Sequence, residues 1–166
     1  MSRSQRAGSA ISVVELGPDA RAELLQHFLA LDDNDRLLRF NCPVKNPTIE
    51  AYVDRIDFGR DTVFGVRGDQ RELVGVGHFA NVADAAKARV AEYAISVLRG
   101  ARGRGVATML LAHAIACGGQ SGIGHLRMHL LSSNAAMLHI AGKAGMRLVH
   151  ACGETQACFE FPRILR

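Results

Sequence analysis

The sequence predicts a mixed α/β fold, in which a mostly antiparallel sheet of six to seven strands is flanked by helices on both faces. Two long strand-like segments, 72–82 and 89–98, follow one another around a short alanine-rich loop, as in an antiparallel meander. A turn rich in glycine and arginine, 99–105, then leads into an apolar helical segment. A strand–helix–strand–strand series completes the chain, and helices between strands indicate a sheet covered on both faces.

The first third of the chain predicts one short strand and three helices. Residues 11–14 are strand-like, and Pro18 suits the first turn of a helix in which apolar residues recur at helical spacing up to Leu29. Residues 32–40 predict a second helix. Thr48 is expected to cap a third helix with the apolar residues Ile49, Tyr52, Val53 and Ile56.

The rest of the chain supplies the sheet. Residues 61–66, 125–131, 146–151 and 156–161 predict further strands. The helix 106–117 is expected to be covered on most faces, because only Thr108 and His113 in it are clearly polar, and Gly118-Gly119 is expected to end it. Asn134 is predicted to cap a last helix that closes at Gly145.

Composition limits the class of protein. We expect one domain, 11–166, after a flexible N-terminal tail, 1–10. The chain has no apolar run of the ~20 residues that a membrane span needs, and no secretory signal, so we expect a cytoplasmic monomer or homodimer. The four cysteines lack paired metal-ligand spacing, which predicts reduced thiols and no metal. The net charge is +4, but no basic run is interleaved with aromatic residues, which argues against nucleic acid.

The segment 97–107 has the properties of a pyrophosphate-binding turn. Glycines let the main chain approach a ligand closely, the first N–H groups of the following helix are free, and arginines add charge. A dinucleotide fingerprint needs a third glycine where Thr108 stands, and a P-loop needs Gly-Lys-Ser/Thr, which is absent. The candidate binding residues are Arg102, Gly103, Arg104, Gly105, Val106, Ala107 and Thr108.

Two motifs together resemble those of the GNAT superfamily of N-acetyltransferases. Arg102, Gly105 and Ala107 match its Arg/Gln-x-x-Gly-x-Gly/Ala motif, and Val97 stands where a hydrophobic residue ends the family's fourth strand. Residues 134–146 are similar to the later motif Asn-x-x-Ala/Met-x-x-Leu-Tyr-x-Lys-x-Gly-Phe. The resemblance covers residues 11–161 and implies acetyl-CoA as co-substrate, with Asn134 among its binding residues.

A narrower resemblance bears on the reaction. Residues 36–40, followed by a helix and then by residues 91–94, are similar to the acetyltransferase domain of bacterial protein-lysine acetyltransferases. This implies transfer of an acetyl group from acetyl-CoA to a primary amine, on a protein lysine or a small molecule, by direct attack in a ternary complex. In the family, residues corresponding to 31–60 set the acceptor specificity.

The resemblance also implies catalytic residues. Glu92 occupies the place of the catalytic glutamate in lysine acetyltransferases; the alternative is that it pairs with Arg89 or a histidine and only stabilises the sheet. His78 is the second candidate, because a β-meander would bring it near Glu92 on the same face, and His125 and His129 are weaker ones. A freed backbone N–H of Val97 or Leu98 would bind the thioester carbonyl.

One position departs from the family. A tyrosine general acid belongs at position 141, which is Ala141 here, and Tyr93 should point away from Glu92 because neighbouring side chains on a strand alternate. Either the thiolate leaves unassisted, or water, Ser132 or Ser133 assists it. The alternative to an enzyme is a non-catalytic regulatory module that binds acyl-CoA.

Overall fold

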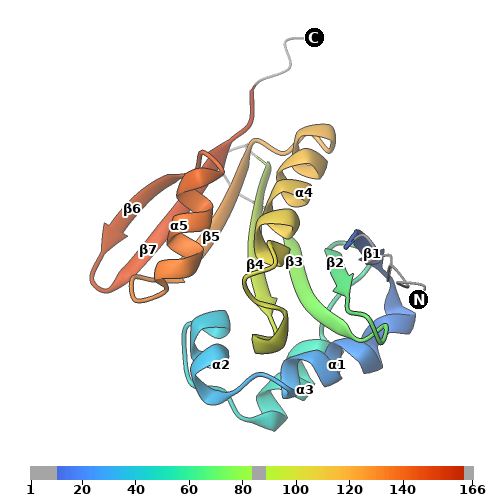
Figure 1. The fold of residues 1–166 in the computed structure, drawn as a ribbon. Coiled ribbons are helices and arrows are strands. Elements are labelled where there is room, and N and C mark those ends of the chain that lie inside the picture. Colours follow the sequence, from blue (N-terminus) through green and yellow to red (C-terminus); the bar gives the residue numbers. More distant parts are fainter. Residues whose placement is uncertain (1–10, 84–88, 163–166) are drawn as a thin grey trace, which may run out of the picture.

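The computed structural model describes residues 11–83 and 89–162, which form a seven-stranded sheet covered by helices (Figure 1). The predicted tail, 1–10, and most of the alanine-rich loop, 84–88, lie outside the described residues. The elements in chain order are β1 (Val13–Leu16), η1 (Pro18–Ala20), α1 (Arg21–Leu29), α2 (Asp33–Phe40), α3 (Asn46–Asp54), β2 (Thr62–Arg67), β3 (Leu73–Ala83), β4 (Arg89–Val97), η2 (Arg99–Ala101), α4 (Val106–Gln120), β5 (His125–Leu131), α5 (Ala135–Lys143), β6 (Arg147–Ala151) and β7 (Glu154–Glu160).

The strands pair in the order β1-β2-β3-β4-β5-β7-β6, and β4 with β5 is the parallel pair. This pair is short. Its register runs from Val90 opposite His125 to Glu92 opposite Arg127, whereas β4 continues to Val97 and β5 to Leu131. The two strands therefore diverge towards their carboxyl ends, and the backbone of the last part of β4 faces a gap.

Two apolar clusters cover the two faces of the sheet. The first lies under α4 and α5, which both lie in front of the sheet in Figure 1, and includes Phe64, Leu110 and Leu126. The second joins α1 and α3 to the other face and includes Phe28 and Val63. Neighbouring side chains on a strand alternate, so β2 sends Val63 to one cluster and Phe64 to the other. The predicted fold class is confirmed.

Two local predictions were wrong. Helix α3 begins at Asn46 rather than after a Thr48 cap, because Pro47 needs no N–H partner in a first turn. Helix α4 continues past Gly118 to Gln120; Gly118 lies against the Phe161 ring, where an added Cβ would be 2.5 Å from a ring carbon. The expectation that α4 is covered on most faces is confirmed, because its exposed residues form one stripe, Thr108, Ala112, Ala116 and Gln120, and the rest are buried or half-buried.

The strand bounds differ from the predicted ones mainly at the ends of the sheet. β1 and β7 are displaced by about two residues, whereas β5 matches the predicted 125–131. Within residues 11–83 and 89–162, no helix combines the length and apolar character needed to cross a bilayer.

Candidate active site

The glycine-rich loop has the backbone of an anion site. Gly103 and Gly105 have φ angles of 73° and 78°, a region that side chains with a Cβ rarely adopt. Gly105 is also the N-cap of α4, and no side chain in the described residues caps that end. The N–H groups of Val106, Ala107 and Thr108 are thus left for a ligand, at the positive end of the helix dipole.

A cavity of about 470 Å³ opens beside this loop. Its walls come from α2, the end of β4, the loop and the start of α5. The lining residues are Leu31, Asn34, Asp35, Leu38, Arg39, Ile95, Ser96, Val97, Ala101, Arg102, Gly103, Gly105, Val106, Ala107, Thr108, Asn134, Ala136, Met137 and Ile140. It lies where β4 and β5 diverge. We call it the loop cavity.

Most of the predicted binding residues line the loop cavity. Val97, Arg102, Gly103, Gly105, Val106, Ala107, Thr108 and Asn134 all do. Asn134 also caps α5 as predicted, since its side-chain oxygen accepts from the Met137 N–H at 3.3 Å.

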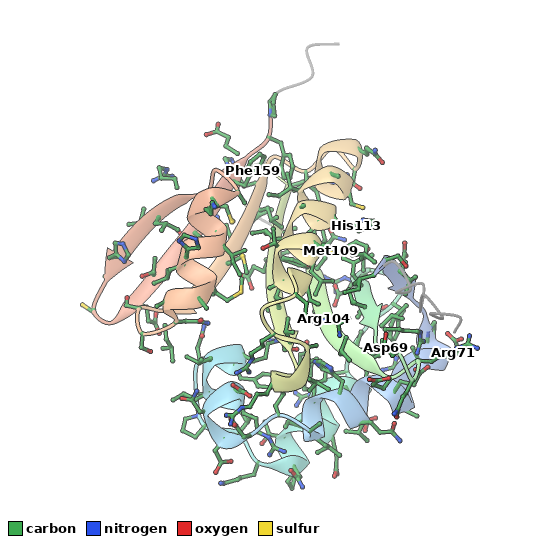
Figure 2. The ribbon with its side chains drawn as sticks, viewed as in Figure 1. Asp69, Arg71, Arg104, Met109, His113 and Phe159 are labelled. Carbon is green, nitrogen blue, oxygen red and sulfur yellow. The ribbon has the colours of Figure 1, made fainter. Side chains whose placement is uncertain are left out.

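Leu98 and Arg104 do not line the loop cavity. The N–H of Leu98 donates to the Val74 carbonyl at 2.8 Å, so this donor is already used within the sheet. Backbone groups alternate in direction along a strand, which turns the Val97 N–H towards the gap beside β5. Arg104 instead lines a separate small depression together with Asp69; both residues are labelled in Figure 2.

Two acids at the start of α2, its N-cap Asp32 and Asp35, pair with the glycine-rich loop, a contact that sequence reasoning did not anticipate. The carboxylate of Asp35 lies 2.6 Å from Arg102, and Asp32 lies 2.5 Å from Arg99. The Asp35 side chain is only 7% exposed. Two arginines of the glycine-rich loop are therefore paired with acids on α2. Asp32 also caps α2, since its side chain accepts from the Asp35 N–H at 2.8 Å, and the cap pattern Asp-x-x-Asp was the available signal.

Glu92 lies on β4 with its side chain about half exposed. Its carboxylate is 3.6 Å from the Nε2 atom of His129, so the histidine neighbour anticipated from the sequence is His129 on β5. Tyr93 points to the opposite face, as predicted, where it is buried and its hydroxyl donates to the Leu110 carbonyl at 2.9 Å. Glu92 does not line the loop cavity.

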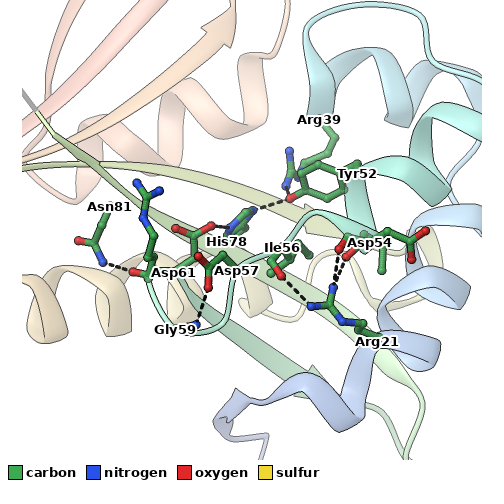
Figure 3. Close-up of polar contacts among 12 residues, drawn as sticks. Arg21, Arg39, Tyr52, Asp54, Ile56, Asp57, Gly59, Asp61, His78 and Asn81 are labelled. Carbon is green, nitrogen blue, oxygen red and sulfur yellow. Dashed lines mark hydrogen bonds and ion pairs between the residues drawn. The ribbon is translucent and has the colours of Figure 1, made fainter.

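His78 belongs to a chain of four polar side chains (Figure 3). Its Nε2 atom is 2.9 Å from an Asp61 carboxylate oxygen, and its Nδ1 atom is 2.6 Å from the Tyr52 hydroxyl. The Tyr52 oxygen in turn accepts from Arg39 at 2.7 Å. Because a carboxylate can only accept, Nε2 carries the proton and Nδ1 accepts from Tyr52. Burial lowers the pKa of His78, although the Asp61 hydrogen bond partly opposes this, so the ring is neutral at pH 7.

A second cavity, of about 420 Å³, lies between α3, the α2–α3 loop and β3. Its lining residues are Phe40, Cys42, Val44, Thr48, Ile49, Tyr52, Arg55, Ile56 and His78. His78 is opposite Ala94 on β4, which makes Glu92 its diagonal neighbour on the same face, at about 7–8 Å. The predicted proximity of His78 and Glu92 is therefore confirmed as a diagonal relationship without a direct contact.

The remaining candidates lie elsewhere. His125 is 4.0 Å from the Cys158 sulfur, and the Ser132 hydroxyl is 2.8 Å from that of Thr155. Ser132 and Ser133 do not line the loop cavity. Ala141 is fully buried in the core, so position 141 gives the cavity no acid. In the described part of the chain, no three His, Cys, Asp or Glu side chains form a potential metal site.

Comparisons with known proteins identify the family and match the fold. A family model described as the acetyltransferase (GNAT) family matches residues 26–146. The GNAT domain of S. lividans PAT has a TM-score of 0.76 at 21% identity, over 91% of this chain and 90% of that one. A GCN5-related N-acetyltransferase from Kribbella flavida has a TM-score of 0.74 at 14% identity, over 92% and 98%. The structure of yncA from Salmonella typhimurium with its cofactor acetyl-CoA has a TM-score of 0.72 at 13% identity, over 95% and 98%. No curated protein matches the sequence.

Proposed function

This chain belongs to the acetyltransferase (GNAT) family, and we propose that it is an N-acyltransferase that moves an acetyl group from acetyl-CoA to a primary amine. The observation that carries the proposal is the loop cavity. It combines uncapped N–H groups at the start of a helix with a gap between diverging strands.

The residues present fit the chemistry of acetyl-CoA. A pyrophosphate suits the polar end of the loop cavity, where Gly103, Gly105 and the first turn of α4 leave N–H groups free. Apolar side chains, including Ile95, Met137 and Ile140, also line the cavity and suit a pantetheine arm. The lining therefore offers N–H groups to the charged half of the ligand and apolar contacts to its uncharged half.

Acyl transfer also needs a site for the oxyanion and a base for the amine. The Val97 N–H faces the gap beside β5, and a backbone donor there would stabilise the oxygen of the tetrahedral intermediate. A lysine ammonium has a pKa of ~10.4, so a base is required near neutral pH. We assign that role to Glu92, whose half-exposed carboxylate is accessible to an incoming amine.

The acceptor is a primary amine on a protein lysine or on a small molecule. The second cavity supports an approach from the side of α2 and α3, since His78 within it is the diagonal neighbour of Glu92. Direct attack in a ternary complex then needs no covalent intermediate on the protein.

A second candidate function is a regulatory module that binds acyl-CoA without turnover. The fully buried Ala141 favours it, because this position provides no acid for the departing thiolate. One experiment separates the two functions. Calorimetry measures CoA binding, and a thiol reagent measures CoA released from acetyl-CoA with a panel of amines and lysine peptides. Binding with amine-dependent thiol release supports the enzyme; binding without release by any acceptor supports the module.

A further inference from the structure

We propose that Tyr52 is a catalytic proton-transfer residue of this chain, coupled through His78 to Asp61 and held by Arg39. The proposal rests on the acyltransferase function above. Ala141 cannot protonate the departing thiolate, and the proposal gives that step to Tyr52 on α3.

The position of Tyr52 is the first argument. Arg39 lines the loop cavity, whereas Tyr52 and His78 line the second cavity. The hydrogen-bonded chain therefore runs from one cavity to the other, and the Tyr52 hydroxyl is its central link. Glu92, the diagonal neighbour of His78, lies on the same face of the sheet. An amine between Glu92 and Tyr52 would have a proton acceptor on each side.

The charges around the hydrogen-bonded side chains suit proton transfer. Arg39 stacks over the rings of Phe28, Phe40 and Tyr52, with its guanidinium carbon 5.4, 4.8 and 5.4 Å from their centres. This packing fixes a positive charge beside the Tyr52 oxygen, which favours a transient phenolate there. On the other side, the neutral Nδ1 of His78 can take the phenol proton, and Asp61 then stabilises the imidazolium.

The proposed step accounts for both protons that the acceptor loses. An ammonium loses two protons on becoming an amide, and Glu92 takes the first. The amine nitrogen bonds to the thioester carbon, and the second proton passes to the Tyr52 oxygen as Tyr52 gives its own to His78. When the carbon–sulfur bond breaks, the imidazolium returns that proton through Tyr52 to the thiolate. The products are the amide, CoA thiol and one proton released from Glu92.

Kinetics of single and double variants test this hydrogen-bonded series of side chains. Tyr52→Phe keeps the ring and its packing, and His78→Gln keeps polarity. We expect each to lower kcat by about 10²-fold with little change in the KM for acetyl-CoA. Because the two residues act as one unit, the double variant should be no slower than the slower single one. Tyr93→Phe makes the same chemical change at the other tyrosine of the chain, on the opposite face, and should leave kcat unchanged.

The pH dependence gives a readout that a merely structural role would not move. The groups facing His78 are Asp61, Tyr52, Arg39 and, diagonally, Glu92. Protonation of His78 removes the acceptor, so part of the acid limb of wild-type kcat should lie below the ordinary histidine pKa and vanish in Tyr52→Phe. If Tyr52→Phe does not fold, 3-fluorotyrosine incorporated into the Tyr93→Phe variant modifies Tyr52 alone. The relay needs a protonated Tyr52 hydroxyl, so kcat should fall at alkaline pH, and the more acidic fluorinated phenol should move this alkaline limb to lower pH.

The outcomes separate this proposal from the function on which it rests. Suppose that the wild type releases thiol, but that the losses of kcat multiply in the double variant or that Tyr52→Phe lowers kcat by less than threefold. Either result overturns the role of Tyr52 in proton transfer and leaves the acyltransferase function standing. An unmoved alkaline limb with fluorotyrosine does the same. Bound CoA with no thiol release by the wild type overturns both.

Discussion

The carboxylate of Asp35 lies 2.6 Å from the guanidinium of Arg102, so a buried acid and the arginine expected to bind pyrophosphate share one wall of the loop cavity. The pair draws α2 against the glycine-rich loop. It also places a negative charge beside the site proposed for phosphates.

Asp35→Asn should therefore strengthen CoA binding. The change removes that negative charge and frees Arg102, and we expect a dissociation constant about three- to tenfold lower, by calorimetry at low salt. Asp33→Asn is the matched control, because Asp33 is exposed and 4.0 Å from the exposed Lys45. Unchanged or weaker binding in Asp35→Asn would show that the pair organises the cavity rather than competing with the ligand.

Gly105→Asp should abolish CoA binding. A carboxylate at the start of α4 would repel phosphates, and the positive φ of 78° adds strain. Wild type with CoA at about 100 times its dissociation constant should gain ~2.7 kcal/mol of unfolding free energy, and the variant should gain none. Gly153→Asp controls for the strain, since Gly153 has φ 83° on the β6–β7 turn. A normal gain in Gly105→Asp would remove the loop from the binding site.

Glu92→Gln should lower turnover with CoA affinity nearly intact. Glutamine keeps the shape of the side chain but cannot accept a proton, and a general base contributes typically ~10²–10⁴ in rate. Glu160→Gln, on the exposed end of β7, is the control. A Glu92→Gln variant with more than half of the wild-type activity would move the role to His78 or to solvent.

Sequence patterns predicted local features best where one short motif determines them. The glycine-rich turn that leads into α4, the Asn134 cap and the bounds of β5 all follow from residues close in the chain. The alternation of side chains along a strand likewise predicted that Tyr93 and Glu92 point to opposite faces.

These patterns could not predict contacts between segments that are distant in the sequence. Asp35 contacts Arg102, which is 67 residues away in the sequence, and Tyr52 contacts His78, which is 26 residues away. The sequence around each of these residues does not specify its partner. Gly118 was misjudged for the same reason. Glycine usually ends a helix, but here the Phe161 ring from the end of the sheet packs against a continuing helix.

Ser132→Ala and Ser133→Ala should each lower kcat by less than about tenfold, roughly 1.4 kcal/mol of barrier. Neither residue lines the loop cavity, and the Ser132 hydroxyl is bonded to Thr155. Steady-state kinetics at saturating acetyl-CoA measure both. A larger loss, with folding intact, would identify a serine as the acid that position 141 lacks.

His27 should make the protein less stable as the pH falls below neutrality. The ring is 2% exposed; its Nδ1–H donates to the Leu73 carbonyl at 2.9 Å, and Nε2 accepts from the Ser96 hydroxyl at 2.8 Å. Burial, the largest effect, lowers the pKa of His27 from 6.5 to about 4. Between these two pH values the unfolded chain binds a proton that the folded chain does not.

The stability contributed by neutral His27 is complete above pH 6.5 and is lost on acidification towards about pH 4. Between pH 7.5 and pH 5 the loss is about 2 kcal/mol, since one pKa unit corresponds to ~1.36 kcal/mol. Urea unfolding followed by circular dichroism measures it, because the chain has no tryptophan. His27→Gln should lower stability at pH 7.5 but show a shallower dependence of stability on pH. Some dependence should remain, because burial also lowers the pKa of His78. His139→Gln, on the exposed side of α5, should keep the wild-type slope. An equal slope in wild type and His27→Gln would mean that His27 is already protonated in the fold.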